Sequence, residues 1–331
     1  MYRARLEFND GAVVELGVEP GETVAEAAMR AEAPLRTDCL SGECGACLAH
    51  CAPGARVEGE KAAVVSREEA AEGLVATCCT RLSGDVELAL DYALHPMPSE
   101  PAKLRGVLES HEMVCGSVSR LEIRLDDVEG FTFQPGQYLR LRPPGMRAAR
   151  AYSIASTPAE LPLITLLIRH VEGGQVGAWL RDKAAPGDRL VLQAPLGGFA
   201  ADHKASRQVF IAGGTGLAPV LSMIAAQRGS GREMVLCFGC TRPEDLFMAD
   251  ELARLAAAIP ELDLRIALVH GAEGAIRPGH AVSLLGPQDF VPGAVFHLCG
   301  PPGMIDAARA TLRENGVPAR AIRSERFLVS T

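Results

Sequence analysis

Four cysteines have the spacing of an iron–sulfur site. Cys39, Cys44 and Cys47 have four and then two residues between them, and Cys78 follows after thirty more. Plant-type 2Fe-2S clusters are bound by cysteines with this spacing. Glycines inside the loop permit the close backbone approach by which N–H groups face the sulfurs. The sequence therefore predicts a 2Fe-2S cluster rather than a zinc site, since zinc usually takes two Cys-x-x-Cys pairs.

The fourth ligand must be chosen between two adjacent cysteines, because neighbouring side chains diverge. An apolar run at 74–77 leads into Cys78, and the turn Ser83-Gly84-Asp85 follows. In plant-type ferredoxins the last ligand ends an apolar strand and precedes a similar turn at this distance. We therefore expect Cys78 to bind iron, and we assign no role to Cys79.

Two glycine-containing turns follow apolar runs in the C-terminal part of the chain. Gly213-Gly214-Thr215-Gly216 comes after the run 209–212, and Cys299-Gly300-Pro301-Pro302-Gly303 comes after the run 295–298. Such turns expose backbone N–H groups and a positive helix end to a phosphate. The first turn is not Gly-x-Gly-x-x-Gly, so a tight turn without a ligand stays the alternative. Two such turns in one sheet nevertheless favour a nucleotide site.

A cationic, an aromatic and a hydroxyl residue lie on one expected strand, Arg150-Ala151-Tyr152-Ser153. Side chains alternate along a strand, so Arg150 and Tyr152 share a face. Arg suits a phosphate contact, and Tyr suits stacking on a ring. Exposed strands often carry Arg and Tyr, so it is the position ahead of a glycine-rich nucleotide domain that favours a cofactor site.

Composition excludes several classes of protein. The chain has 331 residues, of which 48% are hydrophobic, enough for two or three packed domains. Its longest aliphatic run, 163–168, is too short to span a bilayer, and the alternating segment 1–8 lacks the apolar core of a signal peptide. Ten cysteines, four of them in a cluster pattern, fit a metal site in a reducing compartment better than disulfides. We expect a cytoplasmic protein with no membrane contact.

Acidic residues concentrate in the N-terminal part. Residues 1–92 contain 17 Asp and Glu against 8 Lys and Arg, a net charge of −9, so the remaining residues carry +1 of the total of −8. This distribution argues against a nucleic acid as partner. It indicates electrostatic docking to a basic protein surface.

The elements around the cysteines form a small domain. Strands are expected at 2–8 and 12–18 around the turn Asn9-Asp10-Gly11. Helices begin at Thr23 and Ser66, each with Glu three residues later, as a capping box requires. Gly73 ends the second helix before the strand that carries Cys78. We expect a β-grasp ferredoxin domain at 1–92, followed by a proline-containing linker at 93–102.

The rest of the chain divides into a barrel and an open sheet. Short strands separated by Gly and Pro favour an antiparallel β-barrel at 103–203; they are expected at 104–113, 118–125, 138–141, 163–169 and 189–193, with a helix at 176–183. From 204 to 331 strands and helices alternate, which favours a parallel α/β sheet of the Rossmann-like kind. The expected elements are 209–212, 217–228, 234–238, 246–258, 264–269, 295–298 and 304–315. The fold class is therefore multidomain.

With these segments in order, the whole chain resembles the ferredoxin–NADP reductase superfamily. Within it, the chain is most similar to the reductase components of bacterial ring-hydroxylating oxygenases of the benzoate or anthranilate dioxygenase type. In that family an N-terminal 2Fe-2S domain precedes a flavin barrel and an NADH domain. The resemblance implies FAD, a 2Fe-2S cluster and NADH as cofactors, and a terminal oxygenase as the protein partner.

The resemblance also implies roles for residues in matching motifs. Arg150 binds the flavin pyrophosphate, Tyr152 packs on the isoalloxazine, and Ser153 hydrogen-bonds near its N5. With Ser153, the catalytic residues implied on the nicotinamide side are Cys299, Glu325 and Phe327. The other cofactor-binding residues implied are Gly174, Gln175, Val176, Gly177, Gly214, Thr215, Gly216, Gly300 and Pro301.

The chain departs from the family pattern at two positions. The flavin-phosphate helix of the family usually begins Gly-x-x-Ser, and here Gly177 takes the Ser position. A backbone N–H remains, but a hydroxyl contact is lost, so we expect flavin to be held less tightly. Leu40 lies where the cluster loop of the family commonly has Arg. The loop therefore does not indicate which partner the protein prefers.

We therefore expect an NADH-dependent iron–sulfur flavoprotein that passes electrons to a terminal oxygenase in aromatic compound degradation. NADH is expected over NADPH because the loop 239–245 offers one Arg against two carboxylates, whereas a 2′-phosphate calls for a net basic pocket. The alternatives are the reductase of a soluble di-iron monooxygenase and a non-catalytic ferredoxin-type electron carrier.

Overall fold

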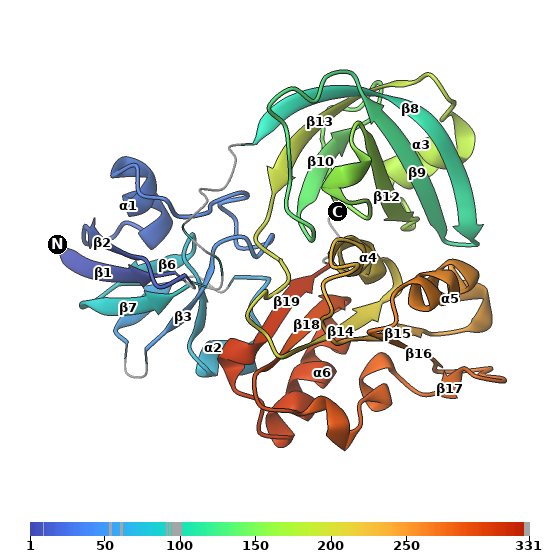
Figure 1. Cartoon of the computed structure of the whole chain (residues 1–331). Coiled ribbons are helices and arrows are strands. Elements are labelled where there is room, and N and C mark those ends of the chain that lie inside the picture. Colours follow the sequence, from blue (N-terminus) through green and yellow to red (C-terminus); the bar gives the residue numbers. More distant parts are fainter. Residues whose placement is uncertain are drawn as a thin grey trace. The chain divides into compact units, whose positions relative to one another are not determined.

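The computed structural model describes residues 1–8, 10–52, 55–59, 62–90, 92, 94 and 101–327. The chain separates into two compact units, Met1–Ser99 and Glu100–Thr331 (Figure 1). Most of the expected linker at 93–102, and Asn9 of the expected hairpin turn, lie outside the described residues. The last residue of the expected linker, Ala102, is the first residue of a strand.

The first unit contains a five-stranded sheet and two short helices. Its elements are β1 (Tyr2–Glu7), β2 (Val13–Val18), α1 (Val24–Arg30), β3 (Leu48–Cys51), β4 (Val57–Gly59), α2 (Arg67–Ala71), β5 (Leu74–Ala76), β6 (Thr80–Leu82) and β7 (Val86–Ala89). The sheet order is β2-β1-β7-β3-β5, with β1 parallel to β7, and β4 pairs separately with β6. This is the expected ferredoxin-type fold.

Both helices of the first unit begin where the capping boxes predict. Thr23 Oγ1 accepts a hydrogen bond from the Glu26 N–H at 3.2 Å, and the Glu26 carboxylate accepts one from the Thr23 N–H at 2.7 Å. Ser66 and Glu69 repeat the exchange. One detail differs from the prediction, because β5 ends at Ala76 and Cys78 lies in the turn after it.

The second unit begins with a nearly closed antiparallel barrel. Its strands are β8 (Ala102–Cys115), β9 (Val118–Leu125), β10 (Tyr138–Arg142), β11 (Arg150–Ser153), β12 (Leu163–Arg169) and β13 (Arg189–Leu196). They lie in the order β11-β10-β13-β8-β9-β12, and a bridge between Ile154 and Leu166 joins the two ends. Helix α3 (Gln175–Asp182) packs Trp179 and Leu180 into the barrel core.

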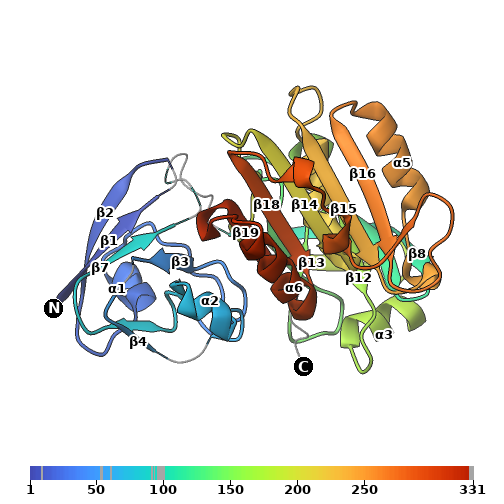
Figure 2. The same cartoon turned by 90° about the horizontal axis from the view of Figure 1, so that it is seen from below.

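A parallel sheet completes the second unit (Figure 2). Its elements are β14 (Arg207–Gly213), α4 (Leu217–Ala225), β15 (Met234–Cys240), α5 (Ala249–Ala258), β16 (Leu262–Leu268), β17 (Arg277–Pro278), β18 (Ala294–Gly300), α6 (Pro302–Glu314) and β19 (Ile322–Arg326). The strand order is β17-β16-β15-β14-β18-β19. Helices α4 and α5 pack on one face and α6 on the other, as expected of a Rossmann-like sheet.

Several expected bounds in this sheet were wrong. Helix α5 begins at Ala249 rather than at Leu246, because Phe247 is buried against Phe238, with ring centroids 5.6 Å apart, and Met248 takes a left-handed conformation with φ +59°. Helix α4 ends at Ala225, three residues early. Strands β17 and β19 were not predicted, since both are short or polar.

Among the described residues, no helix is both long enough and apolar enough to cross a membrane.

Candidate functional site

The four predicted cysteine ligands come together in the first unit. Cys39, Cys44 and Cys47 lie on the irregular segment before β3, and Cys78 lies between β5 and β6. The thiol of Cys39 contacts those of Cys44 and Cys78. The thiol of Cys47 contacts that of Cys78. Two distant segments thus supply one group of four sulfurs.

Backbone N–H groups face these sulfurs. The N–H groups of Ser41 and Cys44 each lie 3.4 Å from Cys39 Sγ, and the N–H of Cys78 faces the Cys47 sulfur. Contact with the Cys78 thiol and N–H lowers the pKa of Cys47 to about 7, against the opposing effect of burial. Such donors stabilise thiolates, the form that binds iron, so the residues fit a 2Fe-2S cluster.

The loop requires glycine at a position where a second cysteine packs against it. Gly42 has φ +72°, and a Cβ there would lie 2.7 Å from Cys79 Sγ. Cys79 Sγ is 3.8 Å from Cys78 Sγ, but it is Cys78 whose thiol contacts Cys39 and Cys47. This geometry supports Cys78 as the fourth ligand, which stays a prediction.

Within the described parts of the chain, no three His, Cys, Asp or Glu side chains are placed around a single metal ion. A 2Fe-2S cluster has two irons, each of which takes two protein ligands. The four thiols therefore need not converge on one point, and their arrangement agrees with such a cluster.

Three predicted catalytic residues meet in the second unit, although they lie on three strands. Ser153 ends β11, Cys299 is on β18 and Glu325 is on β19. Ser153 Oγ donates to Glu325 Oε2 at 2.9 Å, and the Cys299 thiol lies 3.9 Å from the same oxygen. One carboxylate thus joins a barrel strand to the parallel sheet.

The environment of this carboxylate changes the acidity of two groups. Burial raises the pKa of Glu325 to about 7, against the lowering effect of the Ser153 and Cys299 hydrogen bonds. Burial, and then the neighbouring Glu325 charge, raise the pKa of Cys299 well above its usual value. Near neutral pH, Glu325 therefore exchanges a proton while Cys299 stays a neutral thiol.

The two glycine turns lie against each other. They follow β14 and β18, which are adjacent. A Cβ on Gly216 would lie 2.1 Å from the carbonyl oxygen of Cys299, and one on Gly300 would lie 3.1 Å from that of Gly213. Sheet order reverses at β14, between β15 and β18, which is where open α/β sheets bind nucleotides. The turns, with Thr215 in the first, Gly214 at φ +53° and Pro301 at the start of α6, fit a nucleotide phosphate.

The barrel strand β11 presents its predicted residues on two faces. Tyr152 pairs with Leu139 and Arg150 with Leu141 on β10. Paired residues share a face, so Arg150 and Tyr152 share one, as predicted. Ser153 points the other way, to Glu325. Burial raises the pKa of Tyr152, which keeps its phenol neutral beside the expected flavin ring.

The start of α3 brings together Gly174, Gln175, Val176 and Gly177. Gly174 is the N-cap, and no side chain caps the helix there. The first N–H groups of a helix without a side-chain cap are suited to an anion. These residues fit the expected flavin phosphate.

Phe327 and Gly197 complete the surroundings of Glu325. The Phe327 N–H donates to the Gly300 carbonyl at 2.9 Å, which holds the backbone of Phe327 against the second turn. Gly197 has φ +85°, and a Cβ there would lie 2.7 Å from the Tyr138 ring and 3.9 Å from Glu325 Oε1. Sequence reasoning missed Gly197. The available signal was the pair Gly197-Gly198 after the last barrel strand.

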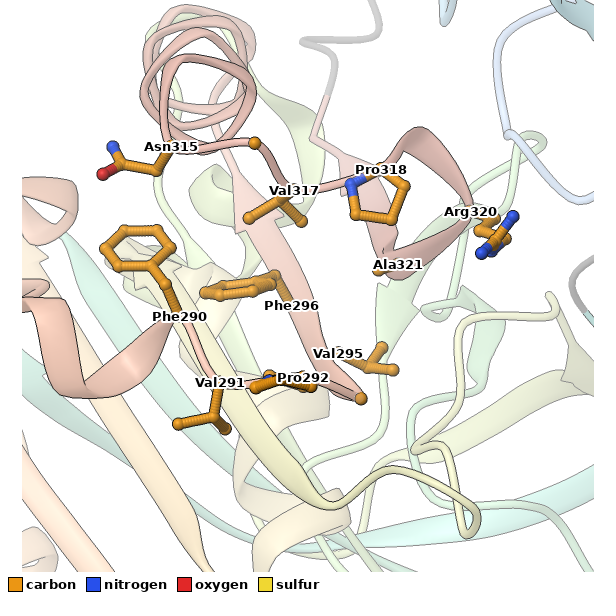
Figure 3. Close-up of a pocket in the computed structure, with 13 residues that line it drawn as sticks. Phe290, Val291, Pro292, Val295, Phe296, Asn315, Val317, Pro318, Arg320 and Ala321 are labelled. Carbon is orange, nitrogen blue, oxygen red and sulfur yellow. The ribbon is translucent and has the colours of Figure 1, made fainter.

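A cavity of about 430 Å³ lies at the beginning of β18 (Figure 3). It is lined by Phe290, Pro292, Phe296, Val317 and Arg320, among others. These residues surround the beginning of β18, whereas the glycine turns follow the strand ends. The cavity is therefore separate from the expected nucleotide site.

Three family models match successive parts of the chain. The model of the 2Fe-2S iron-sulfur cluster binding domain matches residues 8–83, that of the oxidoreductase FAD-binding domain matches 105–200, and that of the oxidoreductase NAD-binding domain matches 210–310. The chain thus has the domains for all three expected cofactors.

Curated relatives are similar over nearly the whole chain. The toluate 1,2-dioxygenase electron transfer component of Pseudomonas putida is 30% identical over 99% of this chain and 99% of its own. The reductase component DmpP of phenol 2-monooxygenase, from a Pseudomonas species, is 32% identical over 96% of this chain and 92% of its own. A solved structure, the ferredoxin reductase in carbazole 1,9a-dioxygenase, has the same fold, with a TM-score of 0.67 over 99% of both chains at 21% identity.

Site chemistry, domain order and these relatives agree. The chain belongs to the family of FAD- and NAD-binding oxidoreductases with an N-terminal 2Fe-2S domain that serve as the reductase, or electron transfer, components of dioxygenases and monooxygenases.

Proposed function

We propose that this protein passes electrons from NADH through FAD and a 2Fe-2S cluster to a terminal oxygenase that acts on an aromatic compound. One observation carries the proposal: the Glu325 carboxylate contacts both Ser153 and Cys299. These contacts join the flavin barrel to the nicotinamide sheet. When bound, nicotinamide supplies a hydride, flavin links two-electron to one-electron transfer, and the cluster carries single electrons.

The residues around the carboxylate have separate tasks in this proposal. Glu325 holds a proton that Ser153 can relay across their 2.9 Å hydrogen bond, since the hydroxyl passes its own proton on as it takes one from the carboxyl group. Cys299 has no exposed surface and keeps water from that side. The backbone of Phe327 is bonded to the Gly300 turn, and the Phe327 ring limits where a nicotinamide ring can lie. Arg150 and the start of α3 bind the flavin phosphates.

NADH should be the preferred nicotinamide. In the loop after β15, Arg242 lies 3.7 Å from the Glu244 carboxylate, so its charge is already paired. A 2′-phosphate would meet this carboxylate as well as the arginine. We expect kcat/KM for NADH to exceed that for NADPH by at least about tenfold, a difference of about 1.4 kcal/mol. Comparable values for the two cofactors would refute the preference.

The partner is met, in our proposal, through the acidic N-terminal domain. Residues 1–92 carry a net charge of −9, while the remainder carries +1. We propose domain bounds of 1–92, 103–203 and 204–331, and a cytoplasmic setting in which the ten cysteines stay reduced. A partner with a basic docking face would be attracted from a distance.

A second candidate differs only in the partner. Relatives that serve monooxygenases, such as the phenol 2-monooxygenase reductase component, are as similar to this chain as those that serve dioxygenases. The electron path within the chain is the same in both.

Stopped-flow absorbance tests the proposal. Mixing the purified protein with NADH under anaerobic conditions should bleach the flavin first and the cluster afterwards. Addition of an oxidised terminal oxygenase should then restore the cluster absorbance. A protein that contains FAD and cluster but is not bleached by NADH would overturn the proposal and favour a non-catalytic carrier.

A further inference from the structure

Helix α3 has space at the position where its first turn lacks a side chain. A Cβ on Gly177 would lie 3.4 Å from the Cα of His170 and 3.5 Å from Nη1 of Arg181. These are ordinary van der Waals distances, so a Cβ would fit there without displacing the backbone. Nη1 of Arg181 therefore lies in contact with the position that a Cβ of residue 177 would take.

The helix itself brings Arg181 to this place. Residues four apart lie on one face of a helix, and long side chains lean toward its N-terminus. Arg181 thus reaches back over the first turn, where Gly174 leaves the helix without a side-chain cap. A permanent cation thus lies beside Gly177, in a helix turn whose first N–H groups have no side-chain cap.

A neighbouring histidine holds the guanidinium in position. Arg181 Nη1 lies 3.1 Å from His170 Nδ1. Arginine only donates, so Nδ1 must accept and the ring proton must lie on Nε2, which is 2.8 Å from Ser119 Oγ. Burial, followed by the Arg181 charge and His111, lowers the pKa of His170 and keeps the ring neutral. Among the described residues, no carboxylate lies within ion-pair distance of Arg181, so its charge stays available.

We propose that Arg181 binds the pyrophosphate of FAD and replaces the hydroxyl contact that Gly177 cannot make. The inference rests on the proposed flavin site at the start of α3 and deepens it. Under this proposal the lost hydroxyl contact does not weaken flavin binding, because a charge-assisted hydrogen bond is stronger than one from a neutral hydroxyl.

Flavin titration of the full-length apoprotein tests the inference. The variant Arg181→Ala is compared with Lys183→Ala, which removes the same charge from the end of the same helix. Each protein is titrated with FAD and with riboflavin, which has no phosphate, and fluorescence quenching gives Kd. We expect Arg181→Ala to weaken FAD binding on the order of ten- to a hundredfold and to leave riboflavin binding unchanged. Lys183→Ala should bind both like the parent.

A second variant shows whether the space at position 177 is the cause. Gly177→Ser should fit, and in the Arg181→Ala background it should recover part of the lost FAD affinity. Parental FAD affinity in Arg181→Ala would overturn the inference, and so would an equal loss of riboflavin and FAD affinity. If the parent itself fails to bind FAD, the proposed function is wrong, and the comparison between variants is not needed to show it.

Discussion

The two sites of this protein are assembled in different ways. The iron–sulfur loop takes three of its four predicted ligands from ten consecutive residues, 38–47, and Cys39 and Cys44 stay partly exposed. Ser153, Cys299 and Glu325 come instead from three strands in two sheets. A contiguous loop can hold its geometry by local turns and N–H groups. An assembled site depends on the packing of the whole second unit. A substitution there should therefore reduce activity in part, whereas loss of a ligand in the loop should abolish the cluster.

The largest effect is expected in the loop. Cys78→Ser should abolish the cluster, because Cys78 is the thiol that contacts Cys39 and Cys47. Cys79→Ser should keep it, since Cys79 packs against Gly42 and its Sγ lies 3.8 Å from Cys78 Sγ, whereas it is the Cys78 thiol that contacts Cys39 and Cys47. Iron and acid-labile sulfide are measured in both purified variants. An intact cluster in Cys78→Ser would remove the proposed ligand set.

A smaller but large effect is expected at the assembled site. Glu325→Ala and Cys299→Ala should slow FAD reduction by NADH on the order of a hundredfold, because misplacement of reacting groups is costly. Flavin content should stay close to that of the parent. Single-turnover kinetics give the rate, and absorbance gives the flavin. Parental rates in both variants would show that the roles assigned from the family do not apply here.

The acidity of Glu325 predicts a pH-dependent stability. Its folded pKa of about 7 lies above the unfolded value of 4.5. The folded state therefore keeps a proton that the unfolded state loses, and stability falls as pH rises from about 4.5 to about 7 and is level above. Glu325→Gln lacks this titration. Between roughly pH 5 and pH 8 the parent should lose on the order of 2 kcal/mol relative to the variant.

Urea unfolding at a series of pH values measures this difference. The relevant quantity is the difference in free energy of unfolding between the parent and Glu325→Gln, because the other groups titrate in both proteins. A difference that does not change with pH would mean that the pKa of Glu325 is not raised in the folded protein.

The smallest effect concerns the docking of the partner. It should change a rate that depends on the first unit and leave a rate within the second unit unchanged. If the oxygenase meets the acidic N-terminal domain, electron transfer to it should slow severalfold as salt rises, since attraction is screened over roughly 8 Å at physiological ionic strength. FAD reduction by NADH within the second unit should hardly change. Both rates are followed across a salt series. Equal responses, or none, would favour the alternative that the acidity only serves solubility.

The contrast between the two sites also explains what the sequence could predict. Cysteine spacing is a local signal, so Cys39, Cys44 and Cys47 were recognisable from their positions alone, as were the capping boxes at Thr23 and Ser66. The contact of Ser153 with Glu325 spans 172 positions, and only the resemblance to a family pointed to it. Spacing carries no information about a contact that the fold alone creates.

Smaller errors have the same origin. Met248 has a helix-favouring side chain, yet burial of Phe247 draws that segment out of α5. Gly197 and Arg181 gave no motif, because their importance comes from what lies opposite them. Propensity and pattern predict an element, and tertiary packing decides its ends.

The contact between the two glycine turns limits how this family can change. A Cβ on Gly216 would lie 2.1 Å from the Cys299 carbonyl, so no side chain enters there unless the turn after β18 moves. Such a move would also carry the Cys299 thiol and the Gly300 carbonyl that holds Phe327. Positions 216, 299 and 300 should therefore be inherited as a set, and homologues that change one should show compensating changes in the others.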